Sequence, residues 1–266
     1  MLLEPGDVVA VRYGESSGTR AEQFYRYGVY REPDGPLTMD FFFWAVRTPE
    51  SVVLIDSGFN PAVVDWRPGR KCVTPPVEAL RALGVDPDQV SRVVVTHAHY
   101  DHIGNLSAFP EARFTLQRRE LDFWTGPYAG EPAFAASVEK EEIAFLTDAV
   151  RAGRVDFVDG DAELAPGIRG VLSPGHCPGQ QMIEIATPGG GLLLCSDALH
   201  LVEEMERNMP FHVFFDLVAM YQSFDRIREY ARSGWTVVAG HDPQVMSGFP
   251  AVPGAEGLAV KLGSTS

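Results

Sequence analysis

The chain has 266 residues, of which 45% are hydrophobic and 22% charged, a balance typical of a globular protein with a sizeable core. Its 36 acidic and 22 basic residues give a formal net charge of −14, which argues against nucleic-acid or anionic-membrane binding because both need a basic face. The three cysteines are too few for a disulfide framework, and no stretch is long and apolar enough to span a membrane. We therefore expect one domain over residues 1–266, without a signal peptide, in the cytoplasm.

The predicted elements are short strands interrupted by three helices. Strands are expected where apolar runs are bounded by turn residues, and helices where apolar residues recur every three or four positions. Strands are predicted at 8–12, 40–47, 52–55, 92–96 and 113–117, with four more between 155 and 196 and a last one at 235–239. Helices are predicted at 76–83, 139–151 and 215–232, and a hairpin turn at 48–51. Because this order lacks a regular βαβ alternation, it predicts two β-sheets with helices outside them.

The main chemical signal is a group of histidines directly after the predicted strand at 92–96. The segment reads Thr96-His97-Ala98-His99-Tyr100-Asp101-His102. His97 and His99 are two residues apart after a strand, so their imidazoles can converge on one ion. Asp101 and His102 follow across a turn. Imidazole nitrogen and carboxylate oxygen suit zinc and similar divalent metals, so the segment predicts a metal site.

Three later segments each place one ligand-type residue soon after an apolar strand. These residues are His176, Asp197 and His241. A lone histidine is more often a hydrogen-bonded structural residue than a ligand, so each segment alone is a weak signal. Together with the first segment they indicate one metal centre, built on loops at one end of a rigid sheet.

These seven residues resemble the complete ligand set of the metallo-β-lactamase superfamily. The resemblance extends from the turn at 56–58 to residues 240–242 and implies a four-layer αββα sandwich of two mixed β-sheets flanked by helices. It also implies two Zn²⁺ ions per chain, with Mn, Fe or Co as alternatives. His97, His99 and His176 would hold the first ion. Asp101, His102 and His241 would hold the second, with Asp197 as the bridge between the two.

Within that superfamily the chain looks most like the quorum-quenching N-acyl-homoserine lactonases. The similarity rests on the chain length, on Ser196-Asp197 and on the ending Gly240-His241-Asp242-Pro243. It implies a hydrolase that opens a lactone or ester through a hydroxide bridging two metal ions. An N-acyl-homoserine lactone or a related hydrophobic lactone is the expected substrate, and Asp101 or Asp197 would carry the proton to the leaving oxygen.

His200 is a departure from the lactonase pattern. Those enzymes typically carry a tyrosine three residues after the bridging aspartate, where it contacts the substrate carbonyl. We expect His200 to stand at the metal edge and to donate a hydrogen bond to that carbonyl instead. Asp56 is interpreted as a residue that supports a ligand or a turn rather than as a catalyst. The aromatic stretch at 211–221 favours a hydrophobic acyl or aromatic substrate.

Alternatives stay open at this point. A glyoxalase II-like thiolester hydrolase shares all seven ligands, although we see no basic segment after His241 that would bind glutathione. An iron-dependent sulfur dioxygenase would need only His97, His176 and Asp197, and a metal-binding sensor would bind ligand without turnover. We expect no nucleic-acid or membrane partner, while an exposed aromatic N-terminal hairpin would suit a homodimer.

Overall fold

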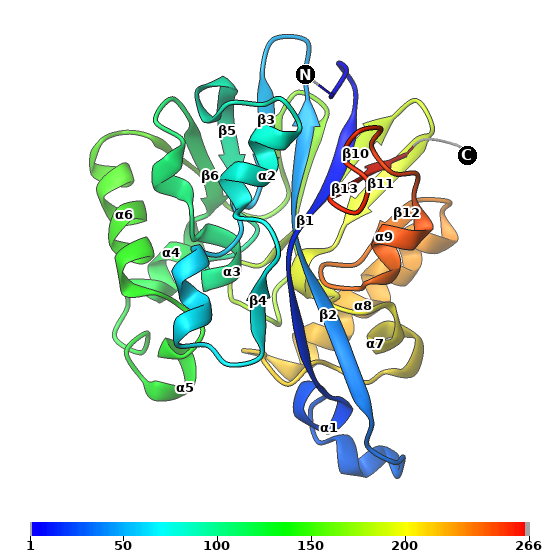
Figure 1. Ribbon diagram of the computed structural model, residues 1–266. Helices are drawn as coiled ribbons and strands as arrows, with labels where there is room; N and C mark the ends of the chain where they lie inside the picture. Colours follow the sequence, from blue (N-terminus) through cyan, green and yellow to red (C-terminus); the bar gives the residue numbers. More distant parts are fainter. Residues whose placement is uncertain (1, 264–266) are drawn as a thin grey trace.

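The computed structural model describes residues 2–263, which fold into two β-sheets packed face to face with helices on both outer sides (Figure 1). The first sheet runs in the order β13 (Ala259–Leu262), β1 (Val8–Thr19), β2 (Pro36–Arg47), β3 (Val52–Ile55), β5 (Val90–Val94), β6 (Arg113–Gln117) and β7 (Val155–Val158), with β4 (Arg70–Cys72) also paired to β1. The second runs β12 (Thr236–Val238), β11 (Gly190–Leu194), β10 (Gln181–Thr187), β9 (Ile168–Leu172) and β8 (Ala162–Ala165). These layers confirm the predicted sandwich of two mixed sheets.

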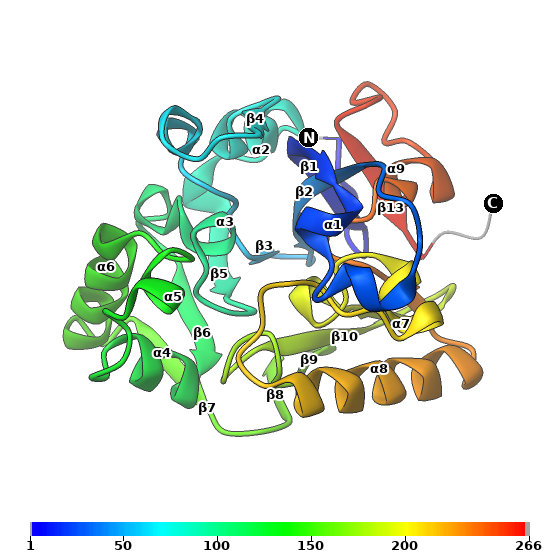
Figure 2. The same cartoon turned by 90° about the horizontal axis from the view of Figure 1, so that it is seen from below.

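Helices cover the outer face of each sheet. The first sheet is covered by α2 (Pro76–Ala82), α3 (Tyr100–Ile103), α4 (Arg118–Trp124), α5 (Pro132–Ala135) and α6 (Lys140–Arg151). The second is covered by α7 (Val202–Arg207) and α8 (Leu217–Arg232), and α9 (Gln244–Gly248) packs near β13. Seen from below, α8 lies along the second sheet and α4 to α6 lie on the opposite side of the molecule (Figure 2).

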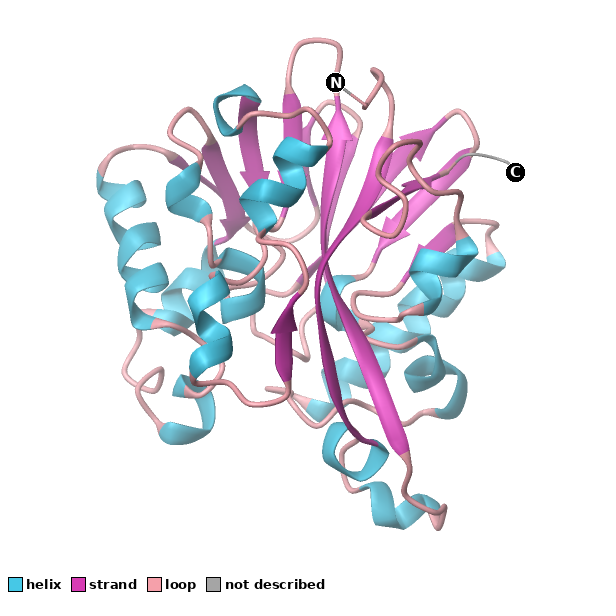
Figure 3. Cartoon of the chain, viewed as in Figure 1, coloured by secondary structure: helices cyan, strands magenta, loops and turns pink. Residues whose placement is uncertain are grey.

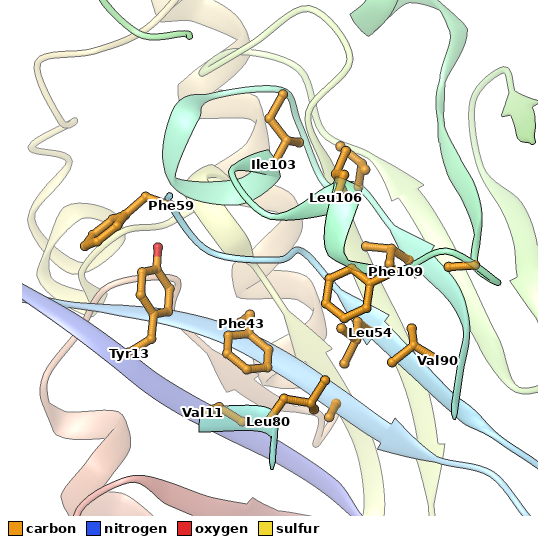
Figure 4. Packing of buried hydrophobic residues seen from close by; sticks show 14 of the residues in the cluster. Val11, Tyr13, Phe43, Leu54, Phe59, Leu80, Val90, Ile103, Leu106 and Phe109 are labelled. Carbon is orange, nitrogen blue, oxygen red and sulfur yellow. The ribbon is translucent and has the colours of Figure 1, made fainter. Parts of the chain in front are cut away.

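Strand β2 shows why the apolar pattern produces four layers. Side chains alternate across a strand, so a strand buried on both faces needs a continuous apolar run. Phe42 and Trp44 point into the core between the two sheets, where they meet Ile183 and Leu194 of the second sheet. The alternate residue Phe43 points outward into the core under α2 and α3 (Figure 4). Full burial of such side chains contributes on the order of 2–3 kcal/mol each.

One half of the first sheet is parallel, which was not predicted from the sequence. Strands β3, β5, β6 and β7 are all parallel, and helices or helical turns connect them. Parallel neighbours cannot be joined by a tight turn, so each connection must cross over the sheet. The hairpin between β2 and β3 is antiparallel, as predicted. The chain is therefore not a regular βαβ repeat, but this half follows that pattern.

Strands β1 and β2 extend well beyond their predicted ends. They pair from Val8↔Val46 to Thr19↔Pro36 with one irregularity, and they carry α1 (Arg20–Gln23) and a 3₁₀ turn (Tyr27–Tyr30) at their tip (Figure 1). The segment 13–19 is rich in Gly and Ser, so it has no apolar alternation to reveal a strand. The region 155–196 also holds five strands, β7 to β11, instead of four. No helix among residues 2–263 is long and apolar enough to cross a membrane.

Candidate metal centre

The predicted ligands lie just after the carboxyl ends of four strands, on loops or on the short helical turns that begin there, and Asp56 lies after a fifth strand. The loops follow β3, β5, β9, β11 and β12, and they bring Asp56, His97, His176, Asp197 and His241 to one edge of the sandwich. Figure 3 shows these connections as loops between the strands and the surrounding helices. Because β3 and β5 are parallel, and β11 and β12 are parallel, their carboxyl ends meet at the same edge of each sheet. This explains how residues as far apart in the sequence as Asp56 and His241 share one site.

Three of these loops contain strained or crowded backbone. Asp56 and Ser196 have positive φ angles of 63° and 46°, a left-handed conformation uncommon outside glycine. Gly240 passes so close to Ser196 that a Cβ atom there would lie 2.5 Å from the Ser196 carbonyl oxygen. This close approach places Asp197 beside His241, and it requires glycine at position 240.

The structure gathers all seven predicted ligands into two adjoining groups. In each group the candidate ligand atoms lie within 4.8 Å of one another, and all the residues are buried. The first group contains His97, His99, His176 and Cys177. The second contains Asp101, His102, Asp197 and His241. A further trio joins His176 and Asp197 to His200.

Asp197 lies between the two groups, with one carboxylate oxygen toward each. Its Oδ1 is 3.0 Å from His241 Nε2 and 3.2 Å from His102 Nε2. Its Oδ2 is 3.2 Å from His176 Nε2 and 3.7 Å from His97 Nε2. A carboxylate placed in this way can be shared between two cations, one at each oxygen.

In two of the histidines, the ring nitrogen that points away from the centre has a hydrogen-bond acceptor that sets the tautomer. His176 Nδ1 donates to the Val213 carbonyl at 3.0 Å, and His241 Nδ1 donates to the Asp40 carbonyl at 2.9 Å. A carbonyl oxygen can only accept, so the proton lies on Nδ1 and the Nε2 lone pair faces the centre. Such partners orient metal-binding histidines and raise their basicity.

Asp56 supports a ligand, as the sequence suggested. Its buried carboxylate accepts from His102 Nδ1 at 2.7 Å, from the Thr96 amide at 2.8 Å and from the Thr96 hydroxyl at 2.7 Å. Thr96 Oγ1 is in turn 3.2 Å from His97 Nδ1 and 2.8 Å from Ser196 Oγ. One carboxylate therefore connects the loops after β3, β5 and β11.

Glu120 holds the loops after β5 and β9 together, and no sequence pattern singled it out. This buried carboxylate accepts from the Ala98 amide at 2.9 Å, from the Gly179 amide at 2.7 Å and from Trp124 Nε1 at 2.8 Å. Ala98 lies between two predicted ligands, and Gly179 ends the loop of a third. Only the contacts with Ala98 and Gly179 reveal this role, because nothing in the local sequence distinguishes Glu120 from other residues of α4.

The residues present fit a pair of divalent metal ions. Among the described residues, the Nε2 atoms of His97 and His102 are buried without a hydrogen-bond partner, which is costly unless a cation lies at each of them. Burial lowers the pKa of His97 and of His176 well below the usual value, which favours the neutral form that binds metal. Burial alone would raise the pKa of Asp197, but the surrounding imidazoles outweigh it and lower that pKa.

His200 lies beside Asp197 and His176. Its side chain is buried, its Nε2 is 3.1 Å from Asp197 Oδ2, and its Nδ1 is 3.2 Å from Glu204 Oε1. The imidazole stacks on Phe211 with 4.0 Å between ring centroids. Neither ring nitrogen has an aligned hydrogen-bond partner among the described residues, and because Nδ1 faces the buried Glu204 carboxylate, Nε2 is the nitrogen open to a further group.

Two adjoining cavities open at the centre. A cavity of about 240 Å³, here called the metal pocket, is bounded by His99, Asp101, Asp197, His200 and His241 together with Phe41 and Phe211. A second cavity of about 500 Å³, the aromatic pocket, shares His99 and His176 with it. Its other walls are mainly aromatic and include Phe123, Trp124, Phe134, Phe214 and Phe215.

Comparison with known proteins identifies the family. The family model of the metallo-beta-lactamase superfamily matches residues 42–241, which include every residue of the two groups. The chain belongs to this superfamily. It is 33% identical to the N-acyl homoserine lactonase AttM of Azorhizobium caulinodans over 184 residues, 67% of this chain and 68% of that protein. It is 28% identical to the N-acyl homoserine lactonase AiiA of Bacillus thuringiensis subsp. kurstaki over 214 residues, 79% and 77% of the two chains.

A solved structure extends the fold comparison to nearly the whole chain. An N-acyl homoserine lactone hydrolase with N-hexanoyl-L-homoserine bound at its catalytic metal centre has a TM-score of 0.76 to this superfamily member, at 22% identity. The match covers 94% of this chain and 99% of that one. The comparisons confirm the predicted fold, the resemblance to the lactonases and the enzyme class, a metal-dependent hydrolase acting on ester bonds.

Proposed function

We propose that this chain is a dinuclear-metal hydrolase that opens a lactone, with an N-acyl-homoserine lactone or a related hydrophobic lactone as substrate. The observation that carries the proposal is the position of Asp197 between two groups of ligand-type residues, with one oxygen toward each. The curated lactonase relatives support the reaction class. The cytoplasmic location, the single domain and the homodimer stay predictions of the sequence.

The proposed ligands follow the two groups. His97, His99 and His176 would hold one ion. Asp101, His102 and His241 would hold the other, and Asp197 would bridge them. Two zinc ions held there would supply Lewis acidity toward the carbonyl and would lower the pKa of bound water.

The chain's own groups would then position the substrate and move the proton. Asp101 and Asp197 both border the metal pocket, and we propose that one of them carries a proton to the leaving alkoxide of the lactone. Cys177 has a supporting role in this proposal, because its Sγ lies 3.1 Å from His99 Nε2 and can hold that ring in place.

His200 takes the role that a tyrosine has in the similar lactonases. Its Nε2 faces the metal pocket beside Asp197, and Phe211 fixes the plane of the ring by stacking. A ring N–H in this position can donate to the substrate carbonyl oxygen. If metal held there also polarised that carbonyl, the loss of His200 would cost about tenfold in turnover, less than the loss of an isolated oxyanion donor.

The aromatic pocket is the proposed site for the apolar part of the substrate. Phe123, Phe134 and Phe215 pack on one another there with ring centroids 5.0–5.6 Å apart. Phe215 is 45% exposed, so this aromatic surface is accessible from solvent and can be covered by an acyl chain.

The proposal is tested by metal analysis and a substrate panel. We expect about two zinc ions per chain, and hydrolysis of N-acyl-homoserine lactones faster than that of glutathione thiolesters or aryl esters. His200→Ala should keep its metal and lose about tenfold in turnover, whereas His200→Tyr should retain activity. Preference for thiolesters would favour the glyoxalase II-like alternative. A single iron with oxygen uptake, or ligand binding without turnover, would contradict a hydrolase.

A further inference from the structure

We propose that the substrate carries a carboxylate remote from the scissile carbonyl, and that Arg70 of β4 recognises it at the metal pocket. The inference rests on the proposed hydrolase and narrows its substrate class to lactones with an anionic tail. The metal pocket has two arginines in its wall, Arg67 and Arg70. Their surroundings differ, and this difference carries the argument.

The charge of Arg67 is already compensated by an ion pair within the protein. Its Nη2 lies 2.7 Å from Glu139 Oε1, its Nη1 donates to the Ala136 carbonyl at 2.6 Å, and its guanidinium lies over the Tyr100 ring at 3.9 Å from the centroid. The ion pair with Glu139 neutralises it within the protein. Arg67 thus has a structural role, joining the loop after β3 to the start of α6.

Arg70 is held in place and forms no direct ion pair, although the carboxylate of Asp101 acts on it from a longer distance. Its Nε donates to the Tyr100 hydroxyl at 3.1 Å and its Nη1 donates to the Pro68 carbonyl at 3.0 Å. Among residues 2–263, no carboxylate oxygen forms an ion pair within 4.0 Å of its guanidinium. A guanidinium has five N–H donors, so Arg70 keeps several for a planar acceptor such as a carboxylate.

The position of Arg70 is fixed from two sides. β4 pairs with β1, which places Arg70 opposite Ser16, and Tyr100 directly precedes the proposed ligand Asp101. The cation is therefore anchored to the same loop that carries part of the metal centre. A pre-positioned guanidinium loses little freedom on binding an anion, which favours specific recognition.

The negative net charge of the chain makes a positively charged side chain at the pocket important for binding an anionic substrate. A chain with a net charge of −14 repels anions, so an anionic substrate would need a dedicated positive group to enter the site. Arg70 cannot be a metal ligand, because a guanidinium has no lone pair to donate. The Tyr100 hydroxyl that accepts from Arg70 is neutral, so this hydrogen bond does not cancel the charge of the guanidinium.

The test compares two lactones that differ only in charge. N-glutaryl-homoserine lactone ends in a carboxylate, and its carboxamide analogue has nearly the same shape without the charge. We expect the protein to prefer the carboxylate by about 10- to 100-fold in kcat/KM, the range of one charge-assisted hydrogen-bonded contact. Arg70→Gln should reduce this preference to near one, Arg70→Lys should keep part of it, and added salt should weaken it.

The matched control is Arg232→Ala. Arg232 is an exposed arginine at the end of α8 whose Nε also bonds a backbone carbonyl, but it lies outside the metal pocket. This variant should keep the full carboxylate preference. Metal content is measured in every variant, so that a change in preference is not confused with a lost ion.

A binding measurement separates the inference from the hydrolase proposal. Glutaramate, a carboxylate fragment without a lactone, is titrated into metal-depleted protein and followed by NMR. Wild type should bind it at least about tenfold more tightly than Arg70→Gln does. Equal binding by both, equal rates on the two lactones, or an equal loss on both lactones in Arg70→Gln would overturn the role of Arg70 and leave the hydrolase standing. Failure to hydrolyse any lactone would instead overturn the hydrolase, while the binding result still decides the role of Arg70.

Discussion

Replacement of Asp56 by asparagine should weaken the second metal position without unfolding the protein. Asparagine has the same shape, so its Oδ1 can still accept from the Thr96 amide, now 2.8 Å from Asp56 Oδ1. Its amide nitrogen would occupy the place of Oδ2, which accepts from His102 Nδ1 at 2.7 Å. A donor would then face Nδ1, and His102 could satisfy it only by moving its own proton to Nε2. A protonated Nε2 cannot bind a metal ion.

The size of the effect follows from the lost contact. A hydrogen bond between an imidazole and a carboxylate contributes about 1.5–3 kcal/mol, and loss of such a partner typically weakens metal binding about 10- to 100-fold. We expect a weakening in this range for the ion at His102. In the metal-free protein the cost should stay near 1 kcal/mol, because removing a buried charge offsets part of the lost bonding. Burial already raises the pKa of Asp56, which reflects this desolvation.

Chelator competition measures both metal affinities, and ¹⁵N NMR of the histidines reports the tautomer of His102. Asp216→Asn is the control, since Asp216 accepts from the backbone amides of Val218 and Ala219 through Oδ1 alone, which asparagine keeps, and it lies outside both groups of candidate ligands. It should leave both affinities unchanged. If Asp56→Asn binds two ions within twofold of wild-type affinity, the argument from the tautomer is wrong.

The remaining predictions concern metal removal, backbone packing and a surface ion pair. Chelation of both ions should lower Tm, because a ligand present at 100 times its Kd stabilises the folded state by about 2.7 kcal/mol; an unchanged Tm by calorimetry would contradict a bound metal. Gly240→Ala should cost about 1–3 kcal/mol in urea unfolding and release metal, because its Cβ would meet the Ser196 carbonyl at 2.5 Å, whereas Gly248→Ala has open space and should be neutral. Hydrogen bonds from Arg113, together with Arg92, lower the pKa of Asp156 to about 2, below its unfolded value of about 3.9. Asp156→Asn should therefore lose up to about 1 kcal/mol at pH 7, since the pair is more than a third exposed, and this difference from wild type should vanish as the pH falls from about 4 toward 2.

Local sequence patterns were sufficient to predict an element where the spacing of its apolar residues alone defined it. Strands β3 and β6 have the predicted bounds of 52–55 and 113–117, because β3 is a short apolar run and β6 alternates apolar Phe114 and Leu116 with polar residues. The helix expected at 215–232 begins instead at Leu217, where the Asp216 side chain accepts from the Val218 and Ala219 amides and caps it. Such boundary shifts depend on single hydrogen bonds that an apolar period does not encode.

Pairing between distant strands decided what the patterns left out. The outer halves of β1 and β2 pair in register, such as Ser17↔Thr38, and Leu37 and Met39 of β2 pack in a small apolar cluster with distant residues such as Met209. The parallel order of β3, β5 and β6 likewise depends on which strand lies beside which. No local window of sequence contains that information, since each partner lies tens of residues away.

The same division holds for the candidate site. The sequence by itself determined which side chains could bind metal, because several histidines and aspartates placed directly after apolar strands are typical of a metal site. The tertiary structure decided how they are used. It placed Asp197 with one oxygen toward each group, joined Asp56 and Glu120 to the ligand loops, and left Arg70 without a carboxylate partner beside the pocket. These are properties of distances between segments far apart in the chain, and they exist only once the two sheets have packed.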